Sequence, residues 1–117
     1  MKKIAIIILG VGVLCSAICY GIDLYQGEVA NIYIEVEDRD GATFTIQTAN
    51  YAVYDLAGYN LQSEATASID DSEIYGLVNT TTTPFSDIKY AQVKFVFIIN
   101  SETRIYYVPL VIYDMSE

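Results

Sequence analysis

Histidine and tryptophan are absent from this 117-residue chain, and cysteine is confined to Cys15 and Cys19. Without histidine, the usual Ser-His and Cys-His nucleophile pairs and the most common zinc ligand are excluded. Both cysteines lie in an apolar run near the N-terminus, so no disulfide can link two parts of the chain that follows. We therefore expect a domain held together by side-chain burial, without catalytic, cofactor-binding or metal-binding residues.

Basic residues are also few: six Lys and Arg stand against fifteen Asp and Glu, which gives a formal net charge of −9. Such a surface repels phosphate, so direct binding to DNA or RNA is not expected. Charged residues make up only 18% of the chain and hydrophobic ones 53%, which excludes a disordered chain. The length fits one domain. Eleven tyrosines suit cross-strand pairs on a sheet surface, or a protein interface.

Two groups of carboxylates are candidates for acid–base catalysis or for calcium binding: Asp38 with Asp40, and Asp70 with Asp71 and Glu73. Both groups lie in predicted turns, where aspartate is favoured for backbone reasons, and this interpretation outweighs a paired-acid hydrolase. The first group begins like a calcium loop, but Ala49 stands where a later acidic ligand is needed. Whether calcium binds is left open, and no enzyme activity is predicted.

Residues 1–21 form an apolar N-terminal segment that begins with Lys2 and Lys3 and carries no further charge before Asp23. Three interpretations fit this pattern. It resembles a secretory signal peptide, with cleavage after Ala17 or Gly21, and it is just long enough for a membrane anchor. Its many isoleucines and valines also suit a retained strand, or an arm inserted into a neighbouring subunit. The remaining residues, 22–117, are expected to form the folded domain.

The chain from 90 to 113 predicts a hairpin of two long strands, 90–99 and 104–113, joined by a turn at 100–103. Alternation places one set of apolar residues on a single face of the first strand: Ala91, Val93, Phe95, Phe97 and Ile99. Pro109 cannot donate a ladder hydrogen bond, so it marks an edge, a bulge or a place where the strand leaves one partner.

Shorter strands are predicted upstream, at 28–37, 43–48, 51–54, 59–69 and 73–79. The clearest is 28–37, in which Ala30, Ile32, Ile34 and Val36 alternate with polar residues. Residues 59–69 have small side chains in the middle and suggest an edge strand. Turns are predicted at 38–41, 55–58 and 70–72, and a loop at 80–87. About seven strands at this spacing predict an antiparallel immunoglobulin-like β-sandwich, with a small barrel as the alternative.

Four stretches of the sequence are similar to those of the small immunoglobulin-like domains of tailed-phage virion proteins: 23–41, 51–58, 89–97 and 101–111. Among these domains, the sequence most resembles the N-terminal domain of the phage baseplate upper protein. It resembles small head-to-tail and neck proteins nearly as well. The resemblance covers residues 22 to 113 and implies repeated copies, no cofactor and contacts with other virion proteins. Residues 1–21 are an addition to this pattern, because such domains begin almost directly at the first strand.

The sequence and the resemblance together lead to one main functional hypothesis. The chain is expected to be a non-enzymatic structural subunit of a virion, a head-to-tail, neck, baseplate or decoration component. It would bind other virion proteins and copies of itself through sandwich edges and through the apolar arm 1–21. The alternative is an exported or membrane-anchored binding module of the bacterial cell envelope, secreted or held there by residues 1–21.

Overall fold

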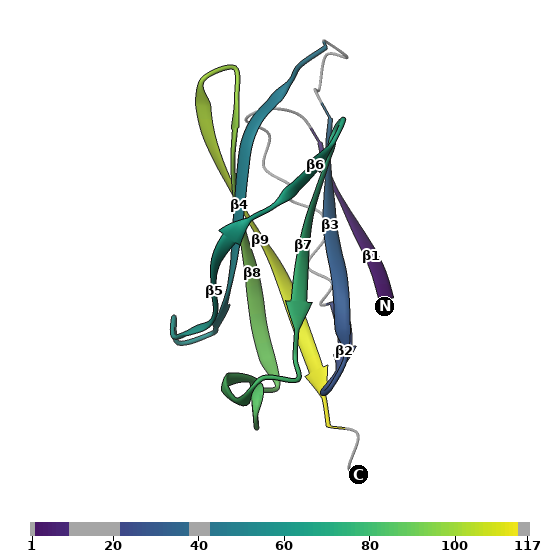
Figure 1. Ribbon diagram of the computed structural model, residues 1–117, viewed down its shortest axis with the longest axis vertical. Coiled ribbons are helices and arrows are strands. Elements are labelled where there is room, and N and C mark those ends of the chain that lie inside the picture. Colours follow the sequence, from purple (N-terminus) through teal and green to yellow (C-terminus); the bar gives the residue numbers. More distant parts are fainter. Residues whose placement is uncertain (1, 10–21, 38–42, 115–117) are drawn as a thin grey trace.

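The structure is a computed structural model, which describes residues 2–9, 22–37 and 43–114. Two β-sheets pack face to face, with β1-β3-β7-β6 in one sheet and β2-β9-β8-β4-β5 in the other (Figure 1). The strands are β1 (Lys2–Leu9), β2 (Ile22–Tyr25), β3 (Val29–Glu37), β4 (Ile46–Asp55), β5 (Asn60–Thr66), β6 (Ser68–Asp70), β7 (Glu73–Asn79), β8 (Tyr90–Ile99) and β9 (Glu102–Tyr113). A short 3-10 helix, η1 (Thr83–Phe85), lies in the loop before β8.

The predicted all-β sandwich is confirmed. About seven strands were predicted between residues 28 and 113, and the structure has seven there, β3 to β9. Two features differ from a purely antiparallel sandwich. The short strand β2 was not predicted, and it pairs in parallel with the end of β9. Strand β1 pairs in parallel with β3, from Lys2 opposite Ala30 to Leu9 opposite Glu37. Both sheets are therefore mixed, with a parallel pair at one margin of each.

The core lies between the two sheets and is built by the alternation that the sequence showed. The first face predicted for β8 is buried along its whole length, and the four apolar residues predicted to face inward from β3 are buried as well. Fully buried side chains of large volume include Phe85, Phe95, Leu24, Ile32, Ile34, Ile74, Ile99 and Leu110. Each such side chain contributes about 1.5–3 kcal/mol through burial. Because both sheets supply these groups, neither sheet is expected to be stable alone.

The hairpin of β8 and β9 turns through two residues, Asn100 and Ser101, with φ of 51° and 62°. Positive φ at both positions is the geometry of the mirror-image turns that match the twist of a hairpin. The turn is shorter than predicted, and β9 begins at Glu102. Ile99 and Glu102 face one another, and the pairing then continues without interruption to Tyr90 opposite Val111.

Two regions were predicted with the wrong strand boundaries. The sequence predicted separate strands at 43–48 and 51–54, whereas the structure has one strand, β4, with a register shift between Ile46 and Thr48 against β8. The predicted strand 59–69 is divided into β5 and β6 at Ala67. A bulge or a sheet change breaks the two-residue alternation, so a pattern search misplaces the ends of such strands.

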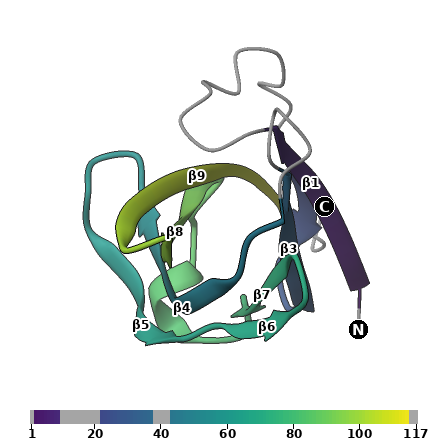
Figure 2. The ribbon, with the colours of Figure 1, turned by 90° about the horizontal axis from the view of Figure 1, so that it is seen from above.

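The division at Ala67 closes one side of the sandwich, because the chain passes there from one sheet to the other (Figure 2). The N–H of Ala67 donates to the carbonyl of Ala49 in β4 at 2.9 Å. The Tyr51 hydroxyl crosses from β4 to donate to the carbonyl of Leu77 in β7 at 3.0 Å. The Gln62 amide, from β5, donates to the same carbonyl at 2.7 Å and accepts from the N–H of Asn79 at 3.1 Å. We call this region the closed side.

The predicted turn at 55–58 is confirmed, since Gly58 has a φ of 93° and the Asp55 side chain accepts from the N–H groups of Ala57 and Tyr59. The turn between β6 and β7 is confirmed as well, with a φ of 56° at Asp71. The predicted turn at 38–41 lies outside the described residues, as do residues 10–21 of the apolar N-terminal segment.

Candidate functional site

The outward face of the five-stranded sheet carries several apolar side chains over β8 and β9, with the polar side chains of Gln92, Lys94 and Thr103 among them. The side chains that alternate with the buried ones point away from the core there, and we call the following set the outer face: Val96, Ile98, Ile105, Tyr107, Pro109 and Val111. Ile105 is 53% exposed and Tyr107 is 48% exposed. The register places Lys94 opposite Tyr107, so one basic group stands among them. Exposed apolar side chains that gather on one face are typical of contact sites in soluble proteins.

The margin of this sheet beside β2 is open over much of its length. Strand β2 has four residues and pairs only with Leu110 to Tyr113 of β9, which has twelve. From Glu102 to Pro109, no strand within the described residues pairs with β9 on the side away from β8. We call this stretch the open edge. Unpaired backbone groups along an edge can accept a strand from another chain.

Two hydrogen bonds at the end of β9 show which residues turn their backbone toward the open edge. The N–H of Ile112 donates to the carbonyl of Lys89 at 2.8 Å, on the β8 side. The carbonyl of Tyr113 accepts from the N–H of Gln26 at 2.7 Å, on the β2 side. The N–H and C=O groups of alternate residues in a strand point to opposite sides. The backbone groups of even-numbered residues in β9 therefore point toward β8. Thr103, Ile105 and Tyr107 therefore direct their N–H and C=O groups to the open edge.

Pro109 has the same parity as these three residues, so its missing N–H faces away from β8 and removes no bond from the β8–β9 ladder. The next residue, Leu110, is the first to pair with β2. The sequence offered an edge, a bulge or a change of partner as reasons for a proline here. The structure shows that Pro109 lies at the boundary between the open and the covered parts of β9.

The tyrosines near this margin have distinct roles, which the sequence could not separate. Tyr106 packs against the core, whereas Tyr107 and Tyr113 are exposed. Tyr113 lies beside Tyr25 of β2, with ring centroids 5.8 Å apart. On the other sheet Tyr33 and Tyr75 stack at 5.0 Å, which confirms the prediction of cross-strand tyrosine pairs.

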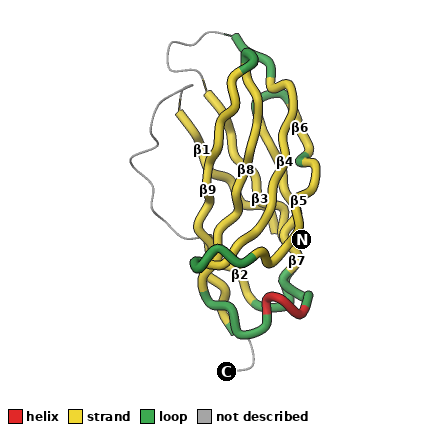
Figure 3. The backbone as a smooth tube through the Cα atoms, turned by 90° about the vertical axis from the view of Figure 1, so that its left-hand side faces the viewer, coloured by secondary structure: helices red, strands yellow, loops and turns green. Residues whose placement is uncertain are grey.

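Two grooves lie at the end of the sandwich where β9 terminates, and Gln26 and Asp114 line both. The larger has a volume of about 510 Å³ and is bordered by Tyr90 and Val111. The Gln26 amide donates to the carbonyl of Phe85 at 2.9 Å, so this end is fixed to the η1 loop, which is the red segment in Figure 3. These grooves are shallow and mixed in polarity, which fits contact with another protein better than a buried ligand.

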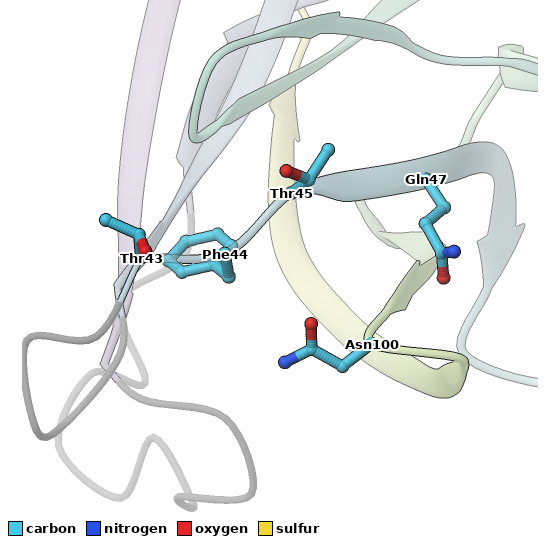
Figure 4. A pocket seen from close by; sticks show the side chains of 5 residues that line it. All are labelled: Thr43, Phe44, Thr45, Gln47 and Asn100. Atoms are coloured by element: carbon cyan, nitrogen blue, oxygen red, sulfur yellow. The ribbon is translucent and has the colours of Figure 1, made fainter.

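A third groove, of about 270 Å³, lies at the opposite end, between the segment before β4 and the β8–β9 turn (Figure 4). Its lining residues are Thr43, Phe44, Thr45, Gln47 and Asn100. The side-chain oxygen Oε1 of Gln47 accepts from the N–H of Ser101 at 2.9 Å, so β4 supports the turn directly. The groove offers hydroxyls and amides, and a nucleophile–histidine pair cannot form in a chain without histidine.

Neither of the two carboxylate clusters considered from the sequence forms a metal-binding site within the described residues. Asp38 and Asp40 lie outside the described residues. Asp70 ends β6, Asp71 lies in the turn and Glu73 begins β7, where the register places it opposite Asp70. Within the residues that the structure covers, no group of three or more His, Cys, Asp or Glu side chains could hold a metal ion. In the same part of the chain, no helix has the length and apolar character needed to span a membrane.

Comparison with solved structures shows a likeness in fold. The fold is similar to the N-terminal domain of phage TP901-1 ORF48, with a TM-score of 0.51, over 97% of this chain and 99% of that one, at 10% sequence identity. No family model and no curated protein matches this chain. The resemblance to small phage β-sandwich domains that the sequence predicted is thus confirmed at the level of the fold.

Proposed function

We propose that this protein is a non-enzymatic structural subunit of a bacteriophage virion, present in repeated copies and bound to other virion proteins. The observation that carries the proposal is the likeness in fold to a phage protein domain over nearly the whole of both chains. A role as a head-to-tail, neck, baseplate or decoration component is the specific form we propose. The formal charge of −9 argues against direct binding to nucleic acid and favours protein partners.

Assembly is proposed to use the margins of the sandwich. The open edge offers backbone groups that no described strand pairs, beside the exposed side chains of Ile105 and Tyr107. At the margin of the other sheet, β1 is the last strand and is paired on one side only within the described residues. We propose that the segment 1–21 is retained in the working protein as a strand or arm. The pairing of Lys2–Leu9 with β3 supports this proposal.

Purified particles from the native source test the proposed function. The expected result is that peptides of this chain co-sediment with intact particles on a density gradient, in a fixed ratio to the other structural proteins. Recovery of the chain in the cell-envelope fraction, with none in particles, would contradict the proposal and would favour the envelope module considered from the sequence.

Intact mass spectrometry of the same material tests whether residues 1–21 are retained. A mass that matches the full chain, or the chain without Met1, is the expected result. A mass that matches a start near Ile18 or Ile22 would show cleavage of the segment, and β1 would then be absent from the working protein.

A further inference from the structure

The open edge has a symmetry that suits a second copy of the same edge. Thr103 and Tyr107 lie two residues to either side of Ile105, and all three direct their N–H and C=O groups outward. If two copies of β9 pair in antiparallel fashion about Ile105, each Ile105 faces the other, and Thr103 faces Tyr107 of the second copy. These are all hydrogen-bonded pairs, in which facing residues exchange both N–H···O bonds.

In the same register, the ladder leaves no backbone N–H without a hydrogen-bond partner at either end. The next facing pair would be Pro109 with Ser101 of the second copy. Pro109 has no N–H, and the N–H of Ser101 already donates to Gln47 at 2.9 Å. Ser101 also has a φ of 62°, so the chain turns away there. The ladder is therefore bounded by residues with no free N–H, and it fits between the hairpin turn and the start of β2.

The side chains support this arrangement. Ile105 and Tyr107 are about half exposed, 53% and 48%, and pairing about Ile105 would bring those of the two copies together on the same face. The outer faces of the two copies would then lie side by side on one face of a joined sheet. Interfaces with two-fold symmetry require such self-complementarity, in which the same patch serves both partners.

Charge also favours a second copy at this edge over a basic partner. The ionised side chains at the open edge are Glu102 and Arg104, and these two form an ion pair with each other. The edge therefore has no uncompensated carboxylate to attract a cationic strand, and no excess charge to prevent its own approach. The remaining obstacle is the net charge of −9 on each copy, which salt screens within about 10 Å at 0.1 M.

We propose that the open edge of β9 is a homodimer interface, in which two copies pair β9 with β9 in antiparallel register about Ile105. This proposal rests on the structural role above, because it assigns the surface that joins repeated copies. It differs in what tests it: the dimer is measured on the purified chain, whereas the virion role is measured by the composition of particles. Either proposal can therefore fail alone.

Analytical ultracentrifugation of the full chain, across a wide range of concentrations, is the first test. The native chain is expected to dimerise, and more strongly as salt is added. Ile105→Lys is expected to weaken the dimer at least about tenfold, because like charges would face one another across the edge. The matched control is Thr48→Lys, which adds the same charge at an exposed position of β4 on the same sheet. Its dimer should equal that of the native chain.

Ile105→Pro is a second variant that tests the backbone pairing directly. The N–H of Ile105 points away from β8, so proline removes an edge donor and leaves the β8–β9 ladder complete, as Pro109 already does. The variant should keep the native circular dichroism spectrum and be monomeric. Hydrogen exchange by NMR should then show the Ile105 and Tyr107 amides of the native chain protected only where the dimer forms. The Arg104 and Tyr106 amides, which face β8, should be protected at every concentration.

Three results would overturn the proposal. The first is a chain that stays monomeric and exchanges its Ile105 and Tyr107 amides rapidly. The second is a dimer that Ile105→Lys and Ile105→Pro leave unchanged, which would place the contact on another surface. The third is protection of these amides in the monomer, which would mean that the edge is already covered within one chain.

Discussion

The two sides of this sandwich differ in how the edge strands of the sheets are covered. On the closed side the chain runs from β5 into β6 and so passes from one sheet to the other (Figure 2). Side chains of Tyr51 and Gln62 then reach the carbonyl of Leu77 across the gap between the sheets. On the open side, β2 covers only the last four residues of β9.

This difference suggests that one side stabilises the monomer and the other mediates association. Contacts on the closed side join the two sheets within one chain, so changes there should alter the free energy of unfolding of the monomer. At the open edge, the side chains of Ile105 and Tyr107 are about half exposed, so changes to them should alter association and leave the monomer stable. The following substitutions test whether stability and assembly separate in this way.

Gly76→Ala is expected to have the largest effect of these changes on the closed side. A Cβ atom at Gly76 would lie 2.8 Å from Cδ2 and 2.9 Å from Cγ of the Tyr51 ring, which is buried and cannot move freely. Overpacking of this kind costs about 1–3 kcal/mol, which exceeds the gain of about 0.4–1 kcal/mol from a less flexible unfolded chain. Urea unfolding should therefore show a lower midpoint with an unchanged slope.

The control for Gly76→Ala is the same change in a Tyr51→Leu background. Removing the ring removes the clash, so the cost of Gly76→Ala should fall to near zero or become a small gain. An equal cost in both backgrounds would show that the ring is not the cause and would contradict the close packing of β4 on β7.

Gln62→Leu should destabilise the monomer by about 1–2 kcal/mol, because it removes two hydrogen bonds between β5 and β7. The carbonyl of Leu77 keeps the Tyr51 hydroxyl, but the partly buried N–H of Asn79 loses the Gln62 oxygen. Thermal unfolding at low protein concentration measures the loss. Gln47→Leu is the matched control, since its one bond to Ser101 is exposed. A similar loss in both variants would argue against a special role for the closed side.

Tyr51→Phe should cost less than Gln62→Leu, about 0.5–1 kcal/mol. It removes the hydroxyl but keeps the ring, and the carbonyl of Leu77 keeps the Gln62 amide at 2.7 Å. Chemical denaturation of the two variants side by side gives the order. A larger cost for Tyr51→Phe would mean that the hydroxyl, and not the Gln62 amide, is the main link between the sheets.

The parts of this fold that the sequence predicted well are those where burial alone decides the pattern. Strands β3 and β8 have an unbroken alternation, and the residues predicted to face inward from them are buried. The pattern failed where the backbone changes parity or partner. Ala49, Tyr51 and Ala52 are all buried in β4, and bulges there interrupt the alternation that separates two faces.

The sequence could predict only part of the candidate interface. Pro109 correctly marked a change along β9, and a two-residue turn at Asn100 and Ser101 would have given the parity of every residue after it. The position of β2 could not be predicted, because four residues are too few for a periodic pattern and a parallel partner is chosen by tertiary packing. Within the described residues, β2 begins opposite Leu110 and so sets the limit of the open edge, which could therefore be found only in the structure.

Ile105→Thr should have the smallest effect on the monomer, and for that reason it tests the comparison most sharply. Ile105 is half exposed and threonine suits a strand, so the monomer should lose no more than about 0.5 kcal/mol at low concentration. At high concentration the native chain gains stability from association, by mass action, and the variant should gain less. Thermal unfolding of both chains at two concentrations measures the difference. If the variant loses the same stability at both concentrations, Ile105 acts within the chain, and the open side would then stabilise the monomer as the closed side does.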